Sequence, residues 1–100
     1  MSQKPKQIRL TPRAVSDLED IWLYSFQTWS PNQADIYHRK IIEGLDRILA
    51  GTAQSRACDH IRPGYFKHSV GSHLIFYRGA DYGFEVVRIL HQSMDIERHL

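Results

Sequence analysis

Residues 60–80 carry the one local charge imbalance in this chain of 100 residues. The stretch contains Arg62, Lys67, Arg78 and three histidines, and it contains no aspartate or glutamate. A surface of this kind can meet phosphate or an acidic partner. It can equally be a solvated sheet edge, where lysine and arginine discourage wrong strand pairing. The residues alone leave both interpretations open.

General acid–base chemistry is a second possibility. His91 or His99 could transfer a proton. A phosphate would also need cations to stabilise its charge, and the candidates are Arg62, Lys67, Arg78 and Arg88. Against this, Arg78 and Arg88 alternate with strand residues and can project beside helix carboxylates. His91 ends a predicted strand, where a structural histidine is commoner than a catalytic one.

The six histidines do not have the spacing of a metal site. None of them forms a ligand pair on one helix face, and Cys58-Asp59-His60 has no second cysteine nearby. The chain also contains no nucleophile motif, no glycine-rich phosphate loop and no dinucleotide fingerprint. We therefore predict neither a metal nor a cofactor.

The composition is that of one globular domain spanning residues 1–100, with 42% hydrophobic and 24% charged residues. The formal net charge is +2, and the charges are not polarised along the chain: residues 1–55 hold seven Lys/Arg and six Asp/Glu, and residues 56–100 hold six and five. A single cysteine, Cys58, favours a reducing compartment. Without a secretory signal or a membrane-spanning apolar run, we expect a cytoplasmic protein that makes no membrane contact.

The centre of the predicted fold is a β-hairpin. Residues 74–78 and 84–90 are rich in aromatic and β-branched side chains, and the polar segment 79–83 between them begins and ends with glycine. Both faces of the two strands are largely apolar, which is typical of strands inside a sheet. Strict alternation predicts that Val86, Arg88 and Leu90 share one face while Val87 and Ile89 share the other.

Two helices are predicted ahead of this hairpin. Thr11-Pro12 starts the first helix, whose apolar stripe comprises Ala14, Leu18, Ile21, Trp22, Ser25 and Trp29. We assign both tryptophans to the core rather than to base stacking. Ser30, Pro31 and Gln33 form a capping box for a second helix that should end at Gly51. The short link between the helices makes them antiparallel neighbours.

Shorter segments complete the order. We predict strands at 7–10 and 66–70, a loop at 52–63, and frayed residues at 1–6. The tail, 92–100, can form a brief helical turn, and we assign it no structural role. The element order is β-α-α-β-β-β. This is an α+β fold in which a helical hairpin packs on a small, mostly antiparallel sheet.

Several segments together resemble a known family. In order they are LTPRA (10–14), DLEDIW (17–22), IRPG (61–64), VGSHLIFYR (70–78), VRILH (87–91), MD (94–95) and RHL (98–100). They are similar, in sequence order and spacing, to the ParE toxins of bacterial type II toxin–antitoxin modules, within the RelE/ParE superfamily. The resemblance covers residues 8–100, and the β-α-α-β-β-β order of that superfamily agrees with the order given above.

This resemblance implies a toxin that poisons DNA gyrase by stabilising its DNA cleavage complex, without enzyme activity of its own. The related RelE branch cleaves messenger RNA on the ribosome, which is the alternative. Its catalytic residues here would be His91, His99, Arg62 and Arg78, although the chain ends without the terminal tyrosine common in that branch. An inactive homologue that only binds its antitoxin is a third possibility.

The resemblance also implies two partners, gyrase and a ParD-like or other small antitoxin, in a hetero-oligomeric complex and without sequence-specific nucleic-acid binding. The charge bias and the unassigned tail suggest a target-binding set: Arg62, Lys67, Arg78, His91, Met94, Asp95 and Arg98. An antitoxin segment that orders on binding would cover half-apolar positions. The candidates are Phe26, Ile36, Tyr65 and Tyr82.

Overall fold

The computed structural model describes residues 5–100, so most of the predicted frayed start lies outside the described residues. In chain order the elements are β1 (Gln7–Leu10), α1 (Pro12–Thr28), α2 (Pro31–Ala50), β2 (Arg56–Ala57), β3 (Tyr65–Val70), β4 (His73–Ala80), β5 (Gly83–His91) and α3 (Ile96–His99). The sheet order is β1-β5-β4-β3-β2, with β1 parallel to β5 and the other pairs antiparallel. The predicted α+β fold is confirmed.

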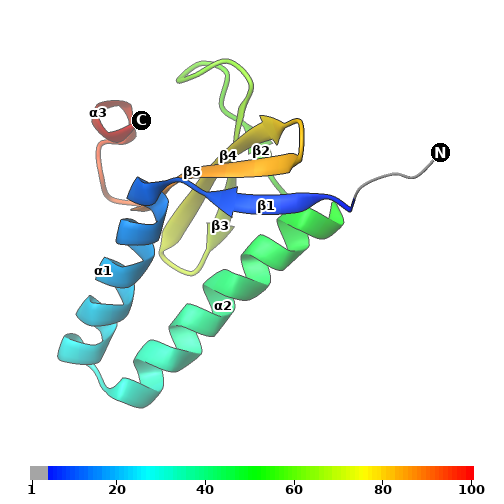
Figure 1. Ribbon diagram of the computed structural model, residues 1–100. Helices are drawn as coiled ribbons and strands as arrows, with labels where there is room; N and C mark the ends of the chain where they lie inside the picture. The colour runs from blue at the N-terminus through cyan, green and yellow to red at the C-terminus, as the bar shows by residue number, and fades with distance from the viewer. Residues whose placement is uncertain (1–4) are drawn as a thin grey trace.

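The helix ends follow from their capping residues. The Thr11 hydroxyl accepts the Ala14 N–H at 3.1 Å, and the Ser30 hydroxyl accepts the Gln33 N–H at 3.1 Å. Gly51 ends α2 with φ 76°, a left-handed conformation that glycine adopts at little cost. α1 and α2 form an antiparallel helical hairpin (residues 12–50), whose connecting end projects beyond the sheet (Figure 1).

The main core lies between this helical hairpin and one face of the sheet. Its buried members are Ala14, Ile41, Leu45, Ile48, Val70, Ile75, Tyr77, Val86 and Ile89. Gly44 lets α2 approach β3 closely, because a Cβ at that position would lie 2.6 Å from the Val70 side chain. Burying large apolar side chains in this layer is the main source of stability, at about 1.5–3 kcal/mol each.

A second, smaller core lies on the opposite face of the sheet, which we call the outer face. It contains Cys58, Phe76 and Leu90, and Ile96 and Leu100 of the tail pack against it. Figure 1 shows α3 on the side of the sheet away from the helical hairpin. The view that the tail has no structural role is therefore wrong, because its apolar side chains cover this second core.

The register of β4 and β5 corrects the predicted alternation. Phe76 pairs with Arg88 and Tyr77 pairs with Val86, so Val87 is an extra residue in a β-bulge. A bulge shifts the alternation by one residue. Val86 and Ile89 therefore both face the main core, whereas Arg88 is on the outer face.

Three further predictions need correction. The five-residue turn at 79–83 is a two-residue turn, because the strands extend to Ala80 and from Gly83. The predicted loop 52–63 contains the edge strand β2, paired with β3. Trp29 is not a core residue: it follows the last turn of α1 as the C-cap, and it is 65% exposed.

Candidate functional site

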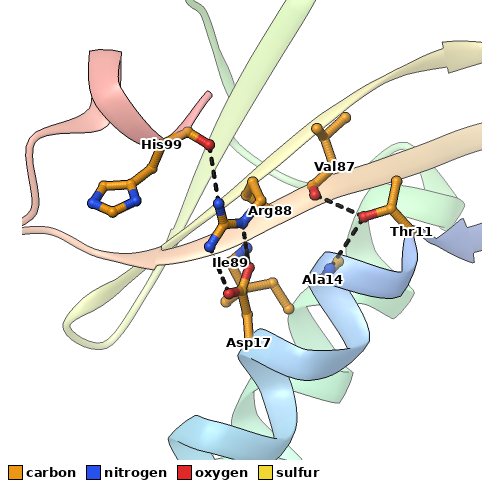
Figure 2. Close-up of polar contacts among 7 residues, drawn as sticks. All are labelled: Thr11, Ala14, Asp17, Val87, Arg88, Ile89 and His99. Carbon is orange, nitrogen blue, oxygen red and sulfur yellow. Dashed lines mark hydrogen bonds and ion pairs between the residues drawn. The ribbon is translucent and has the colours of Figure 1, made fainter.

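A half-buried ion pair joins the first helix to the central hairpin (Figure 2). Arg88 donates from Nε and Nη2 to the two carboxylate oxygens of Asp17, both at 2.8 Å. The same carboxylate accepts the Ile89 N–H at 3.0 Å. Arg88 Nη1 also donates to the His99 backbone oxygen at 3.0 Å. The hydrogen bond and charge of Asp17 raise the pKa of Arg88 despite its burial.

We call this contact between Asp17 and Arg88 the joint. Together with Thr11 it covers the edge of β5 beyond the short strand β1. The Thr11 hydroxyl donates to the Val87 backbone oxygen at 2.8 Å, and its N–H donates to the Val86 oxygen. Thr11 and Asp17 thus satisfy backbone groups of β5 that would otherwise be open to strand addition. Arg88 lies beside a helix carboxylate, as the sequence suggested, and it also contacts the tail through the His99 oxygen.

Two histidines from β4 and β5 line a cleft beside α1. Its volume is about 320 Å³, and its walls are Asp17, Asp20, Ile21, Tyr24, His73, Ile89, His91 and Met94. The Tyr37 hydroxyl accepts the Ser72 N–H at 3.1 Å and lies 2.6 Å from His73 Nδ1. The same hydroxyl lies 3.3 Å from the Val70 backbone oxygen, to which it can donate, so Tyr37 ties His73 to the end of β3. Burial, and then the charge of His91, lower the pKa of His73 to about 4.

The candidate acid–base residues are not brought together. His91 pairs with His73 at one end of the β4–β5 hairpin, and Arg78 pairs with Glu85 five residues further along β4, about 17 Å away. Arg78 is also on the outer face, whereas His91 faces the helix side. Figure 2 shows the imidazole of His99 pointing away from the Arg88 guanidinium. The structure assembles no site from His91, His99, Arg62 and Arg78.

The predicted target-binding residues fall into three groups. Lys67 and Arg78 are on the outer face, and Arg62 is in the loop before β3, whose Ile61 packs on the second core. His91 and Met94 line the cleft. Asp95 and Arg98, at the start of α3 and within it, pair with each other at 3.4 Å. Arg78 is partly neutralised because Glu85 lies 2.9 Å from its Nε, and this carboxylate raises the pKa of Arg78. The sequence missed this compensation because Glu85 is on the next strand.

The helical hairpin carries most of the exposed apolar surface. Among residues 5–100, six of the eight exposed large apolar side chains lie on it: Val15, Leu23, Tyr24, Phe26, Trp29 and Ile36. A groove of about 470 Å³ between α1 and α2 is lined by Val15, Leu18, Glu19, Trp22, Asp35 and His38. The Trp22 indole N–H donates to Asp35 at 3.1 Å, and its ring stacks on Phe26. The sequence does contain a signal for this surface, because the first helix has more apolar residues than a single core-facing stripe needs.

The four predicted antitoxin-binding residues are divided between the two sides of the molecule. Phe26 and Ile36 are exposed on the helical hairpin, by 41% and 39%. Tyr65 packs against the second core of the outer face. The ring of Tyr82 lies under the Arg9 guanidinium, 4.1 Å from it.

Metal-ligand clusters and membrane-spanning helices are both absent from residues 5–100. Within residues 5–100, no group of three or more histidine, cysteine, aspartate or glutamate residues is placed to hold a metal ion. None of the helices in that range is both long enough and apolar enough to cross a membrane.

The fold itself defines a class of protein. A helical hairpin on one side of a mixed five-stranded sheet is the RelE/ParE-like arrangement of small toxins. A solved structure described as the chromosomal ParDE TA system from P. aeruginosa superposes with a TM-score of 0.75, covering 87% of this chain and 96% of that one, at 18% identity. At that identity the likeness concerns the fold alone.

The sequence relatives identify the family within this class. Residues 8–96 match the family model described as the ParE toxin of type II toxin–antitoxin system, parDE. A Mycobacterium tuberculosis protein named Toxin ParE1 is 47% identical over 92 residues, which cover 91% of this chain and 94% of the relative. Toxin ParE1 of Caulobacter vibrioides is 39% identical over 95 residues, covering 95% and 98%. The chain belongs to the ParE toxin family of type II toxin–antitoxin systems.

Proposed function

We propose that this toxin inhibits DNA gyrase by binding to it and stabilising the complex in which DNA is cut. The observation that carries the proposal is the match to the ParE family over residues 8–96. A protein that binds one conformation of an enzyme more tightly than the others shifts the balance among them. The toxin needs no catalytic group for this, because gyrase itself cleaves and rejoins the DNA.

The arrangement of polar residues supports inhibition by binding. A ribonuclease needs an acid–base group and cations close to one scissile phosphate. In this chain Arg78 and His91 belong to opposite faces and opposite ends of the β4–β5 hairpin. Arg88 is occupied by Asp17 and by the tail. These positions favour a contact surface over a catalytic centre.

Purified toxin, incubated with gyrase, supercoiled plasmid and ATP, tests the proposal. We expect linear, protein-linked DNA to accumulate in proportion to toxin concentration. The control is the same toxin after saturation with the antitoxin encoded beside it, which should suppress cleavage. Loss of intact message from translating ribosomes, with gyrase unaffected, would support the ribonuclease alternative. Absence of both effects, together with normal growth on induced expression, would indicate an inactive homologue.

The antitoxin is proposed to bind the helical hairpin. Exposed apolar side chains concentrate there, and the groove between α1 and α2 has an apolar wall from Val15 and Trp22 and carboxylates from Glu19 and Asp35. An amphipathic segment with an apolar stripe and flanking lysine or arginine would complement this surface, and it would order on binding.

Calorimetric titration of the antitoxin into variants tests this placement. We expect Val15→Glu, which adds a charge to the apolar wall, to weaken binding at least tenfold. Tyr82→Ser on the other side of the molecule serves as the comparison. If Tyr82→Ser weakens binding equally, the antitoxin also reaches the sheet, as expected from the presence of Tyr65 and Tyr82 among the predicted antitoxin-binding residues. If Val15→Glu has no effect, the hairpin groove is not its site.

A further inference from the structure

The two layers of the molecule carry opposite net charges. The helical hairpin, residues 12–50, holds four Lys/Arg and six Asp/Glu, a net charge of −2. Residues 5–11 and 51–100, which form the sheet, its loops and the tail, hold eight and five, a net charge of +3. A long-range field of one sign on one side of a protein selects partners of the opposite sign.

The strand register places the basic side chains of the sheet on the outer face. Arg56 pairs with Lys67, and Lys67 pairs with Phe76 of the second core, so these residues share that face. Arg9 pairs with Glu85, which in turn pairs with Arg78, and this second row crosses the same face. With neighbouring strands about 4.8 Å apart, the cations extend about 19 Å from β1 to β2.

Several of these cations are available for a partner. Among residues 5–100, no ion pair involves Arg56, Arg62 or Lys67. Arg9 is held in place by hydrogen bonds from Nε and Nη2 to the Gln7 side chain, at 3.2 and 3.0 Å, and by stacking on Tyr82. Arg78 and Arg88 are already paired with carboxylates.

We propose that the outer face binds the phosphate backbone of double-stranded DNA, through Arg9, Arg56, Arg62 and Lys67, without reading its sequence. This inference rests on the proposed gyrase function: the four cations contact the DNA that gyrase holds, and not the gyrase protein. Single-strand binders need exposed aromatic rings on which bases stack. On this face Phe76 is fully buried, Tyr65 packs in the second core, and Arg9 covers Tyr82. Phosphate contacts therefore dominate, and such contacts carry no base information.

The full-length toxin and a labelled DNA duplex, without gyrase, provide the test by fluorescence anisotropy. Four phosphate contacts give a slope of about −3.6 for log affinity against log salt, or roughly a hundredfold loss between 50 and 200 mM salt. Arg56→Gln combined with Lys67→Gln should reduce the slope by about 2. The matched control is Arg39→Gln combined with Lys40→Gln, two exposed cations of α2, which should leave the slope unchanged.

Arg62→Gln provides a second variant, because Arg62 is exposed in a loop and its substitution does not touch the core. It should reduce the salt slope by about 1. No salt-dependent binding, or equal loss from the α2 control, would overturn the proposal. Unchanged DNA affinity together with weaker gyrase binding by the outer-face variants would also overturn it, in favour of an acidic protein surface. Gyrase cleavage is measured separately, so failure of the proposed function is distinguishable from failure of this inference.

Discussion

The helical hairpin and the outer face of the sheet differ in polarity, in charge and in whether the tail covers them. Six exposed large apolar side chains and an excess of carboxylates mark the helical hairpin. The outer face has a small core that the tail covers, surrounded by cations. A toxin that must meet both an inhibitor and a target benefits from two chemically distinct surfaces, because each partner is then selected by its own complementarity. The comparison predicts that substitutions on one side leave the function of the other side intact.

The largest expected effect is a double dissociation between these sides. Phe26→Ser combined with Ile36→Ser removes exposed apolar anchors, and it should weaken antitoxin binding roughly a hundredfold while gyrase poisoning is retained. Arg62→Glu combined with Lys67→Glu should abolish gyrase poisoning while the antitoxin still binds and the melting temperature is unchanged. Calorimetry and the plasmid cleavage assay measure the two functions. A substitution that impairs both would show that the surfaces overlap.

The second effect concerns the joint between the two layers. Asp17→Ala should lower the free energy of unfolding by about 3 kcal/mol, because it leaves a half-buried guanidinium and the Ile89 N–H without their acceptor. Asp20→Ala, an exposed position one turn along the same helix, should change it by less than about 0.5 kcal/mol. Urea unfolding measures both. Equal losses would mean that helix charge, and not the joint, is responsible.

The third effect is a pH dependence that arises in the cleft. The pKa of His73 is lowered to about 4 in the folded protein, from 6.5. Between these values the unfolded chain binds a proton that the folded protein excludes, so stability falls as the pH drops from 6.5 to 4. The ring is only partly buried, so solvent screening reduces the loss to about 1–2 kcal/mol.

Urea unfolding at pH 7 and pH 5 checks this dependence, with His73→Gln as the comparison. The variant lacks the titrating ring, so its stability should change less between the two pH values. The other titratable groups around the ring are Tyr24, Tyr37, His91, Asp17 and Asp20. If the variant loses as much stability as the parent, these groups account for the dependence and His73 does not.

The smallest effect is expected at the exposed arginine of the outer face. Arg78→Ala removes an ion pair with Glu85 whose arginine side chain is 50% exposed. Pairs in such surroundings contribute little because water screens them. The melting temperature should hardly move, in contrast to Arg88→Ala, which disrupts the joint with Asp17. A large shift for Arg78→Ala would mean that the outer face is more tightly packed than its exposure indicates.

Local signals explain the parts of the fold that could be predicted. Thr11, Ser30 and Gly51 act within a few residues of themselves, so their caps and the helical hairpin follow directly from the sequence. The bulge at Val87 could not be predicted, because it depends on how β5 pairs with β4. The edge strand β2 is two residues long and exists only through its partner β3. Trp29 matched a helical spacing that continues past the point where α1 ends.

The candidate site was less predictable than the fold. Lys67 and Arg78 do share the outer face, with Arg62 in the loop before β3, but the carboxylate that neutralises Arg78 comes from the neighbouring strand. The cleft includes His91 and Met94 of the predicted target-binding set, whereas His73, whose pKa is lowered to about 4, was not in that set. Its environment is assembled from α1, α2, β4 and β5, which no local pattern encodes.

By itself the sequence determined the order of the elements, the helix boundaries and, through its resemblance, the family. Capping groups and apolar periodicity act between residues close in the chain, which is why they can be read from it. Only the tertiary structure decided which cations gather on one surface, because Arg9, Arg56 and Lys67 belong to three different strands. Strand register brings these cations to the outer face, and the pairing of Asp17 with Arg88, separated by 71 positions, links the helical hairpin to the sheet. Such long-range pairing depends on packing free energy summed over the whole domain.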